Sequence, residues 1–215
     1  MGKTTEKFSD FEEVISSLDE IYEIMGPPLP QVLSKVIDHL DDVCRSYIAA
    51  SPFCQIATVH ADGPIDISPK GDPAGFVQVL DDHHLAIPDR PGNRRVDTFR
   101  NLLCDPRVGL FFLVPGTGET LRISGEARIV RDQALRESMS VNGKAPAFAI
   151  VVHVERAFIH CPKCVARSKL WQPDAWAKHD DLPGIGAAMI AHGKLTESEP
   201  ELDKIAEDGG YFDLY

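Results

Sequence analysis

The spacing of hydrophobic residues along the chain changes near residue 51. Before that point apolar residues recur every three to four positions, which predicts a helix over 8–25 and a second from about 31 to 50. Beyond it they form short runs, interrupted by Gly, Pro and Asp, which predict strands. The predicted strands are 53–60, 65–68, 76–80, 84–87, 108–114, 120–130 and 147–159. Shorter helices are predicted over 132–138, 182–192 and 199–208.

Most of these strands follow one another through short turns, and one helix is inserted after the fourth. Such an order favours a closed or nearly closed antiparallel barrel with helices packed on it, a mainly β fold of the α+β class. Gly125 lies inside the strand 120–130 and predicts a bulge or bend there. We expect one domain over 1–215, with N-terminal helices over 1–50, a barrel core over 51–160 and a C-terminal tail over 161–215.

An arginine-rich stretch follows the fourth strand. Pro88 ends that strand, residues 89–93 read as a turn, and Arg94 and Arg95 open a predicted helix. Five arginines lie within a short window of a chain whose formal net charge is -11: Arg90, Arg94, Arg95, Arg100 and Arg107. A local cluster of positive charge beside a helix start predicts a phosphate site. The alternative is a solvated turn whose arginines pair with Asp89, Asp97 and Asp105.

Charge and composition exclude several classes. An acidic chain does not suit general binding to nucleic acid or to an anionic membrane surface. No apolar run approaches the ~18–20 residues of a spanning helix, and the N-terminus lacks the apolar region of a secretory signal. The five cysteines therefore suit a reducing cytoplasm, where we expect the protein to lie.

Two further clusters invite a metal interpretation, and neither is adopted. Cys161 and Cys164 form one Cys-x-x-Cys pair, whereas structural zinc needs four ligands, so a capped turn is favoured over zinc or redox use. His83 and His84 follow two aspartates in a predicted solvated turn, and His153 is expected in the core or an interface. The other three cysteines are expected to fill the core: Cys44, Cys54 and Cys104. We predict no metal site.

Four short motifs occur in the order and spacing of one known family. They are Ser68-Pro69-Lys70, Ile87-Pro88, Asn93-Arg94-Arg95 and Leu170-Trp171-Gln172. With them the chain resembles, from about residue 53 to 176, the pyridoxamine 5'-phosphate oxidase-like family of FMN-binding split barrels. The resemblance implies an antiparallel split β-barrel that forms a homodimer, with FMN in a cleft at the subunit interface.

The resemblance also implies roles for particular residues in holding FMN. Arg94 and Arg95 would hold the phosphate, and the backbone of Ile87 and Pro88 would touch the isoalloxazine ring. Lys70 would lie by the polar edge of the flavin, where a cation stabilises negative charge on the reduced ring.

Ser68 would lie beside that lysine, and Trp171 would flank the flavin from the other subunit. Chemistry and position alone add Arg90, Asn93 and Arg122 as candidates, although Asn93 could simply cap the helix and Arg122 could face solvent. The Arg-x-His pair that handles the pyridoxal substrate in the oxidase itself does not follow Trp171-Gln172. The resemblance therefore implies a retained cofactor, while this departure does not support oxidation of pyridoxamine 5'-phosphate.

We expect an FMN-dependent oxidoreductase that acts on an unidentified small molecule, with no assigned general acid or base. One alternative is a module that binds or sequesters FMN without turnover. Another is a split barrel that uses deazaflavin or haem, with His153 or His84 as a haem ligand. A third is a structural protein whose arginines bind an acidic partner surface.

Overall fold

A computed structural model describes residues 6–179 and 181–215, and the chain divides into two compact units, residues 1–36 and 37–215. The first unit contains the 3-10 turn η1 (Glu6–Phe8) and two short helices, α1 (Leu18–Met25) and α2 (Pro30–Ser34). The predicted helix over 8–25 is therefore wrong in its first half. Ser17 begins α1 instead, because its side chain accepts a hydrogen bond from the Glu20 N–H at 3.2 Å.

The predicted helix over 31–50 is also wrong, because the chain is not helical between α2 and α3 (Asp42–Ala50). Ile37 forms a backbone bridge to Ala157 there, with N–O distances of 3.0 and 2.7 Å. Asp41 then caps α3 by accepting from the Cys44 N–H at 2.8 Å. The bridge supplies hydrogen bonds that a continuous helix would otherwise make, and it pairs residue 37 with β7.

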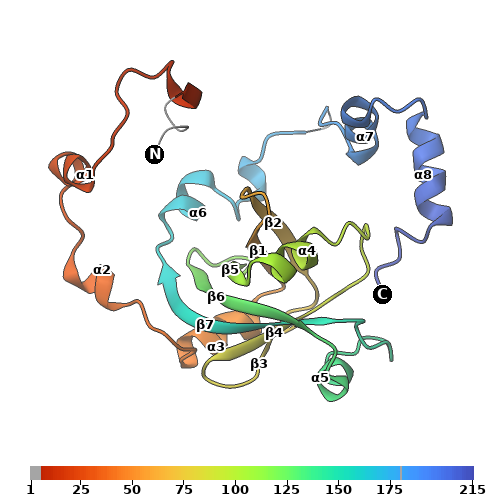
Figure 1. Cartoon of the computed structure of the whole chain (residues 1–215), viewed down its shortest axis with the longest axis horizontal. Helices are drawn as coiled ribbons and strands as arrows, with labels where there is room; N and C mark the ends of the chain where they lie inside the picture. The colour runs from red at the N-terminus through yellow and green to blue at the C-terminus, as the bar shows by residue number, and fades with distance from the viewer. Residues whose placement is uncertain (1–5, 180) are drawn as a thin grey trace. The chain divides into compact units, whose positions relative to one another are not determined.

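Seven antiparallel strands form one sheet in the second unit (Figure 1). They are β1 (Phe53–Val59), β2 (Ile65–Gly71), β3 (Gln78–Val79), β4 (His84–Pro88), β5 (Arg107–Leu113), β6 (Thr120–Val130) and β7 (Ala149–His160). Their order in the sheet is β2-β1-β5-β6-β7-β4-β3. The architecture confirms the predicted α+β fold with an antiparallel split barrel. Pro88 is the last residue of β4, opposite Ala149 of β7.

The predicted bulge at Gly125 is confirmed. The register between β6 and β7 shifts between Ser124 and Gly125. A Cβ at position 125 would lie 1.9 Å from the carbonyl oxygen of His153 on β7. Only glycine allows this close approach of two backbones, and the bulge bends the two longest strands.

The remaining helices are short. They are α4 (Asp97–Cys104), α5 (Gln133–Ser138), α6 (Lys163–Ser168), the 3-10 turn η2 (Pro173–Ala175), α7 (Ile185–Gly193) and α8 (Glu199–Asp208). Helix α6 occupies a stretch that the sequence pattern assigns to a turn. Helix α4 begins at Asp97, so the prediction that Arg94 and Arg95 open it is wrong.

The main core lies between the strands, helix α3 and helix α4. Fully buried side chains from five different strands and from α3 meet there, among them Ile48, Ile56, Leu85, Phe112 and Val152. Cys44 and Cys54 belong to this core as predicted, and burial raises the pKa of each thiol to about 12. Cys104 is exposed at the end of α4, so its predicted core position is wrong.

Within residues 6–179 and 181–215, none of the helices has both the length and the apolar character needed to span a bilayer.

Candidate functional site

The stretch after β4, which we call the arginine turn (residues 89–96), has an unusual backbone. Arg94 and Val96 both adopt left-handed conformations, with φ of 57° and 55°. Asn93 does not cap the helix; its Oδ1 accepts from the Arg95 N–H at 3.1 Å and so closes the turn. A non-glycine residue in this region costs about 1–3 kcal/mol, and a β-branched valine is rare there.

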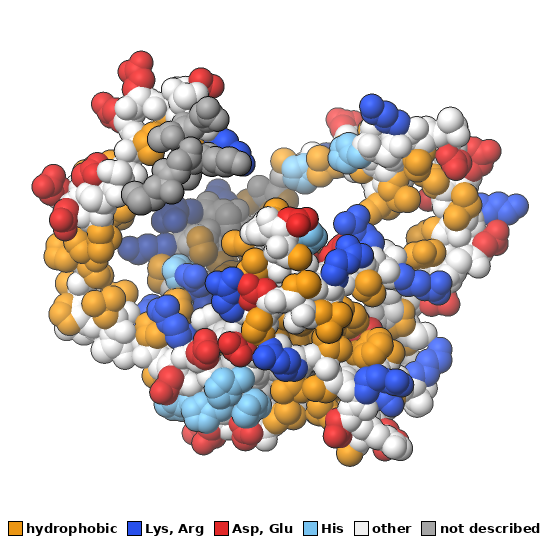
Figure 2. All heavy atoms as spheres, viewed as in Figure 1, with side chains coloured by type: hydrophobic (Ala, Val, Ile, Leu, Met, Phe, Trp, Pro, Cys, Tyr) orange, Lys and Arg blue, Asp and Glu red, His pale blue; other side chains and the backbone are white. Residues whose placement is uncertain are grey.

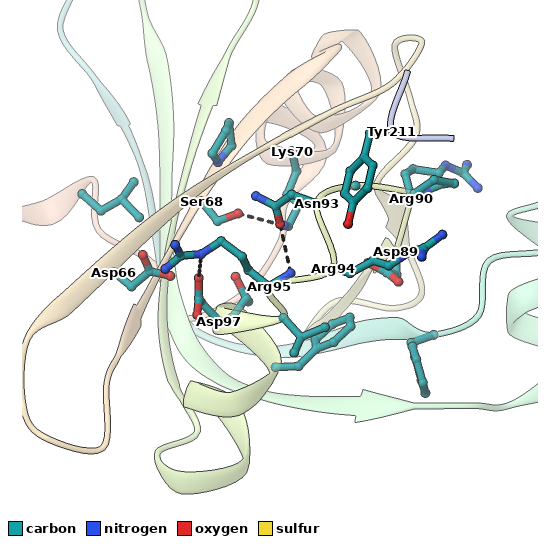
Figure 3. Close-up of a pocket in the computed structure, with 18 of the residues that line it drawn as sticks. Asp66, Ser68, Lys70, Asp89, Arg90, Asn93, Arg94, Arg95, Asp97 and Tyr211 are labelled. Carbon is teal, nitrogen blue, oxygen red and sulfur yellow. Dashed lines mark hydrogen bonds and ion pairs between the residues drawn. The ribbon is translucent and has the colours of Figure 1, made fainter. Parts of the chain in front are cut away.

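A cavity of about 480 Å³ lies beside this turn. Its walls come from β2, the arginine turn, the start of α4 and residues 209–211 near the end of the chain (Figure 3). Six of the predicted site residues line it: Ser68, Lys70, Arg90, Asn93, Arg94 and Arg95. The volume falls within the usual range of small-molecule sites, about 300–1,000 Å³.

The arginines of this region differ in how they are neutralised. Arg95 donates to Asp97 at 2.7 Å, and Arg90 donates to Asp72 at 2.5 Å. Among residues 6–179 and 181–215, no carboxylate lies within ion-pair distance of the Arg94 guanidinium. The alternative of a turn with paired arginines is thus correct for Arg95, which does pair with Asp97. It is also correct for Arg107, which pairs with Asp105.

Lys70 reaches the cavity from the end of β2. Its Nζ donates to the Ser68 Oγ at 2.9 Å, so the two predicted neighbours are in contact (Figure 3). Burial lowers the pKa of Lys70, and the nearby Asp89 carboxylate acts in the opposite sense. Burial also raises the pKa of Asp89, with Lys70 and Arg90 opposing it. The cavity therefore holds a half-buried ammonium beside a carboxyl group whose charge is disfavoured.

The other predicted residues lie outside this cavity. Ile87 and Pro88 are buried in β4, directly before the arginine turn. Arg122 lines a second cavity of about 520 Å³ on the barrel face, with its guanidinium 5.1 Å from the centre of the Phe158 ring. Trp171 donates from its indole Nε1 to the Thr117 carbonyl at 2.6 Å, near the turn between β5 and β6. The predicted flavin contacts of these four residues stay predictions.

Sequence reasoning missed two features of the site. Asp72, whose side chain is 2% exposed, is the buried partner of Arg90. The chain end, predicted only as part of a C-terminal tail, places Gly209, Gly210 and Tyr211 in the cavity wall. The available signal was the change from the acidic helix to Gly-Gly followed by aromatic residues.

Histidine rings gather at the opposite end of β4 (Figure 2). His84 Nε2 lies 3.2 Å from His153 Nδ1, and His84 Nδ1 lies 2.9 Å from an Asp81 oxygen. The His83 and His39 rings extend the cluster. In the part of the chain that the structure describes, no three His, Cys, Asp or Glu side chains are arranged to hold a metal ion. Cys161 and Cys164 are exposed near α6.

Comparison with known proteins gives the family. Residues 40–161 match the model of the pyridoxamine 5'-phosphate oxidase family, which is more than half of the chain, and the chain belongs to that family. The match includes β1 to β7, the arginine turn and α4. No curated protein matches the chain significantly.

Solved structures resemble the same portion only distantly. HupZ of Group A Streptococcus is 22% identical, over 55% of this chain and 92% of HupZ, with a TM-score of 0.46. The haem storage protein HutZ of Vibrio cholerae is 14% identical, over 57% of this chain and 94% of its own, with a TM-score of 0.39. A pyridoxamine 5'-phosphate oxidase-related, FMN-binding protein of Nostoc punctiforme is 17% identical, over 52% and 73%, with a TM-score of 0.36. These scores are too low to carry an argument about function.

Proposed function

We propose that the protein is an FMN-dependent oxidoreductase that acts on a small molecule, and that the cavity beside the arginine turn receives the FMN phosphate. The observation that carries this is the Arg94 guanidinium, which lines the cavity and has no carboxylate partner among the described residues. A guanidinium cannot lose its charge near neutral pH, and its planar donors match phosphate oxygens. Family membership and the Lys70–Ser68 contact support the same assignment.

The residues present fit such a group. Arg94 would bind the phosphate, and Arg95 would add a second positive charge from a guanidinium that Asp97 already orients. Lys70, near the end of β2, would face the polar edge of the isoalloxazine ring. FMN would supply the electron transfer itself, and the protein would position the ring and bind the substrate.

A direct test is the visible spectrum of the purified protein, recorded again after FMN titration and removal of excess cofactor. Retained flavin absorbance in the wild type is the expected result. Replacing Arg94 and Arg95 together by alanine removes two charge-assisted interactions of roughly 1.5–3 kcal/mol each, so FMN affinity falls at least tenfold. Arg100→Ala is the matched control, because Arg100 contacts Asp97 at 3.7 Å and does not line the cavity. A colourless protein that ignores FMN contradicts the proposal.

Turnover is tested separately from binding. A nicotinamide donor that reduces the bound FMN, followed by reoxidation with an acceptor, supports an oxidoreductase. Bound FMN that no donor reduces supports the alternative of a module that only binds the cofactor. We assign no general acid or base, since no described side chain is placed for that role by an observed contact.

The homodimer belongs to the same proposal. Edge strand β2 exposes Ile65 (71%) and Ile67 (61%), and Ile67 borders both cavities. An exposed apolar edge strand is a surface that proteins normally cover, and a second copy of the chain would cover it here. Ile67→Asp should give a monomer in sedimentation and weaken FMN binding. A variant that stays dimeric with unchanged affinity contradicts this arrangement.

A further inference from the structure

The chain end returns to the arginine turn and is fastened there. We call residues 209–215, which follow α8, the tail. The Tyr215 hydroxyl donates to Asp72 Oδ1 at 2.5 Å, and Lys144 Nζ donates to the Tyr215 carbonyl at 2.9 Å. These two contacts join the tail to residues far away in the sequence, one beside β2 and one before β7.

The anchor of the tail is the ion pair between Asp72 and Arg90, and Arg90 lines the cavity. The Asp72 side chain is 2% exposed and the Arg90 side chain 17% exposed. The Arg90 guanidinium also lies 5.9 Å from the centre of the Tyr215 ring. Tyr215 therefore contacts both members of a mostly buried pair, through its hydroxyl and through its ring. Such a contact is more constrained than an ordinary surface ion pair.

Between this anchor and α8, the tail places Tyr211 against Arg94. The Arg94 guanidinium lies 5.6 Å from the centre of the Tyr211 ring, and Tyr211 lines the cavity (Figure 3). Gly210 makes the required bend with a φ of 67°. A guanidinium whose face meets an aromatic ring keeps its N–H donors free around its edge. The contact thus restricts Arg94 without occupying its phosphate-binding donors.

We infer that Tyr211 is a positioning residue for the phosphate of the cofactor, and that the tail completes the site by holding the Arg94 guanidinium at the cavity. This inference rests on the proposed function for the identity of the phosphate ligand. Pre-organising a donor lowers the entropic cost of binding. Loss of Tyr211 therefore weakens binding of the ligand, even though Tyr211 donates no hydrogen bond to it.

The test compares two flavins and four proteins. FMN and riboflavin differ only in the phosphate, and each is titrated into wild type, Tyr211→Ala, Tyr211→Phe and Phe212→Ala while flavin fluorescence is followed. Phe212 is the matched control, because it is a tail aromatic that is 64% exposed and lines neither cavity. We expect Tyr211→Ala to weaken FMN binding roughly threefold to tenfold, the range of a cation–π contact. Riboflavin affinity should not change, and Tyr211→Phe should behave as wild type because it keeps the ring.

Equal affinity of wild type and Tyr211→Ala for FMN overturns the inference, and so does an equal loss for FMN and riboflavin. Wild type that binds neither flavin contradicts the proposed function instead. In that case, calorimetric titration with inorganic phosphate tests the inference independently of the proposed function. Weaker phosphate binding by Tyr211→Ala upholds it for another phosphorylated ligand, whereas no phosphate binding by wild type, or equal binding by both proteins, overturns it.

Discussion

Strand β4 carries a cluster of basic side chains at each end, and the two clusters differ in how their charge is balanced. At the His84 end, imidazoles contact one another and Asp81. At the Pro88 end, guanidiniums crowd one turn, and Arg94 has no carboxylate partner among the described residues. A histidine can lose its proton, so neighbouring rings need no counter-charge. An arginine cannot, so clustered arginines need an anion. The histidine end is therefore complete within the chain, and the arginine end points to a ligand.

The largest effect should come from the strand that joins the two clusters. Ile87→Ala empties a fully buried position in the core, and we expect it to lower the free energy of unfolding by about 2–5 kcal/mol. Urea denaturation followed by circular dichroism measures this. Leu103→Ala is the control, because Leu103 is 80% exposed on α4. Similar midpoints for both variants would show that β4 is not the rigid support of the two ends.

The second-largest effect should distinguish Arg94 from Arg95 in their contributions to FMN affinity. Arg94→Ala alone should lower FMN affinity about tenfold, because it removes a charge-assisted contact of the kind worth ~1.5–3 kcal/mol. Arg95→Ala should cost less, since the Arg95 guanidinium is already engaged by Asp97. Equilibrium titration of each single variant gives the ratio. A larger loss for Arg95 than for Arg94 would reverse the assignment of the phosphate ligand.

A smaller effect concerns the anchor of the tail at high pH. The hydrogen bond to Asp72 raises the pKa of the Tyr215 hydroxyl above its ordinary value of 10.0. The neutral hydroxyl is the form that the folded state favours. Its stabilising contribution is thus complete below pH 10.0 and is lost as the pH rises through the higher folded pKa. Titration of tyrosinate absorbance should show late-ionising groups, because burial also raises the pKa of Tyr47, and Tyr215→Phe should remove one of them. An unchanged titration curve would contradict the contact.

The smallest effect is expected at the histidine end. Backbone N–H donation from His83, followed by the His84 side chain, lowers the pKa of Asp81 below 3.8. The contribution of Asp81 is therefore present above pH 3.8 and is lost as the pH falls through its folded pKa. Asp81→Asn should lower the melting temperature slightly at neutral pH and remove this acid dependence. FMN affinity should not change, and a change would show that the two ends of β4 are coupled.

The strands could be predicted from the sequence because each has its own alternating run and its own turn residues. The long strand over 120–130 was predicted with its observed bounds, and its single internal glycine marked the bulge. The hydrophobic pattern predicts N-terminal helices that are too long, because apolar residues keep helical spacing through residues 35–41. In that segment a capping aspartate and a backbone bridge to β7 interrupt the helix.

The site could be predicted only in part. The order of residue types along the chain identified the arginines of the arginine turn and Lys70 as candidates, because each lies close to a strand end. They did not give which arginine lacks a carboxylate partner among the described residues, since that depends on where the fold places Asp72 and Asp97. Nor could they place Tyr211 or the pairing of Asp72 with Arg90 and Tyr215. With the exception of the Arg90–Asp72 pair, those contacts join residues more than seventy positions apart in the sequence.

The position of the tail in the chain also has a consequence for biosynthesis. The last barrel strand ends at His160, and the tail follows it by roughly fifty residues, which a ribosome adds in about 2–10 s. During that interval the emerging barrel can fold, while Arg94 still lacks the ring that restrains it. Under the proposed function, the cavity therefore reaches its full affinity for a phosphorylated cofactor only after translation has delivered Tyr211 and Tyr215.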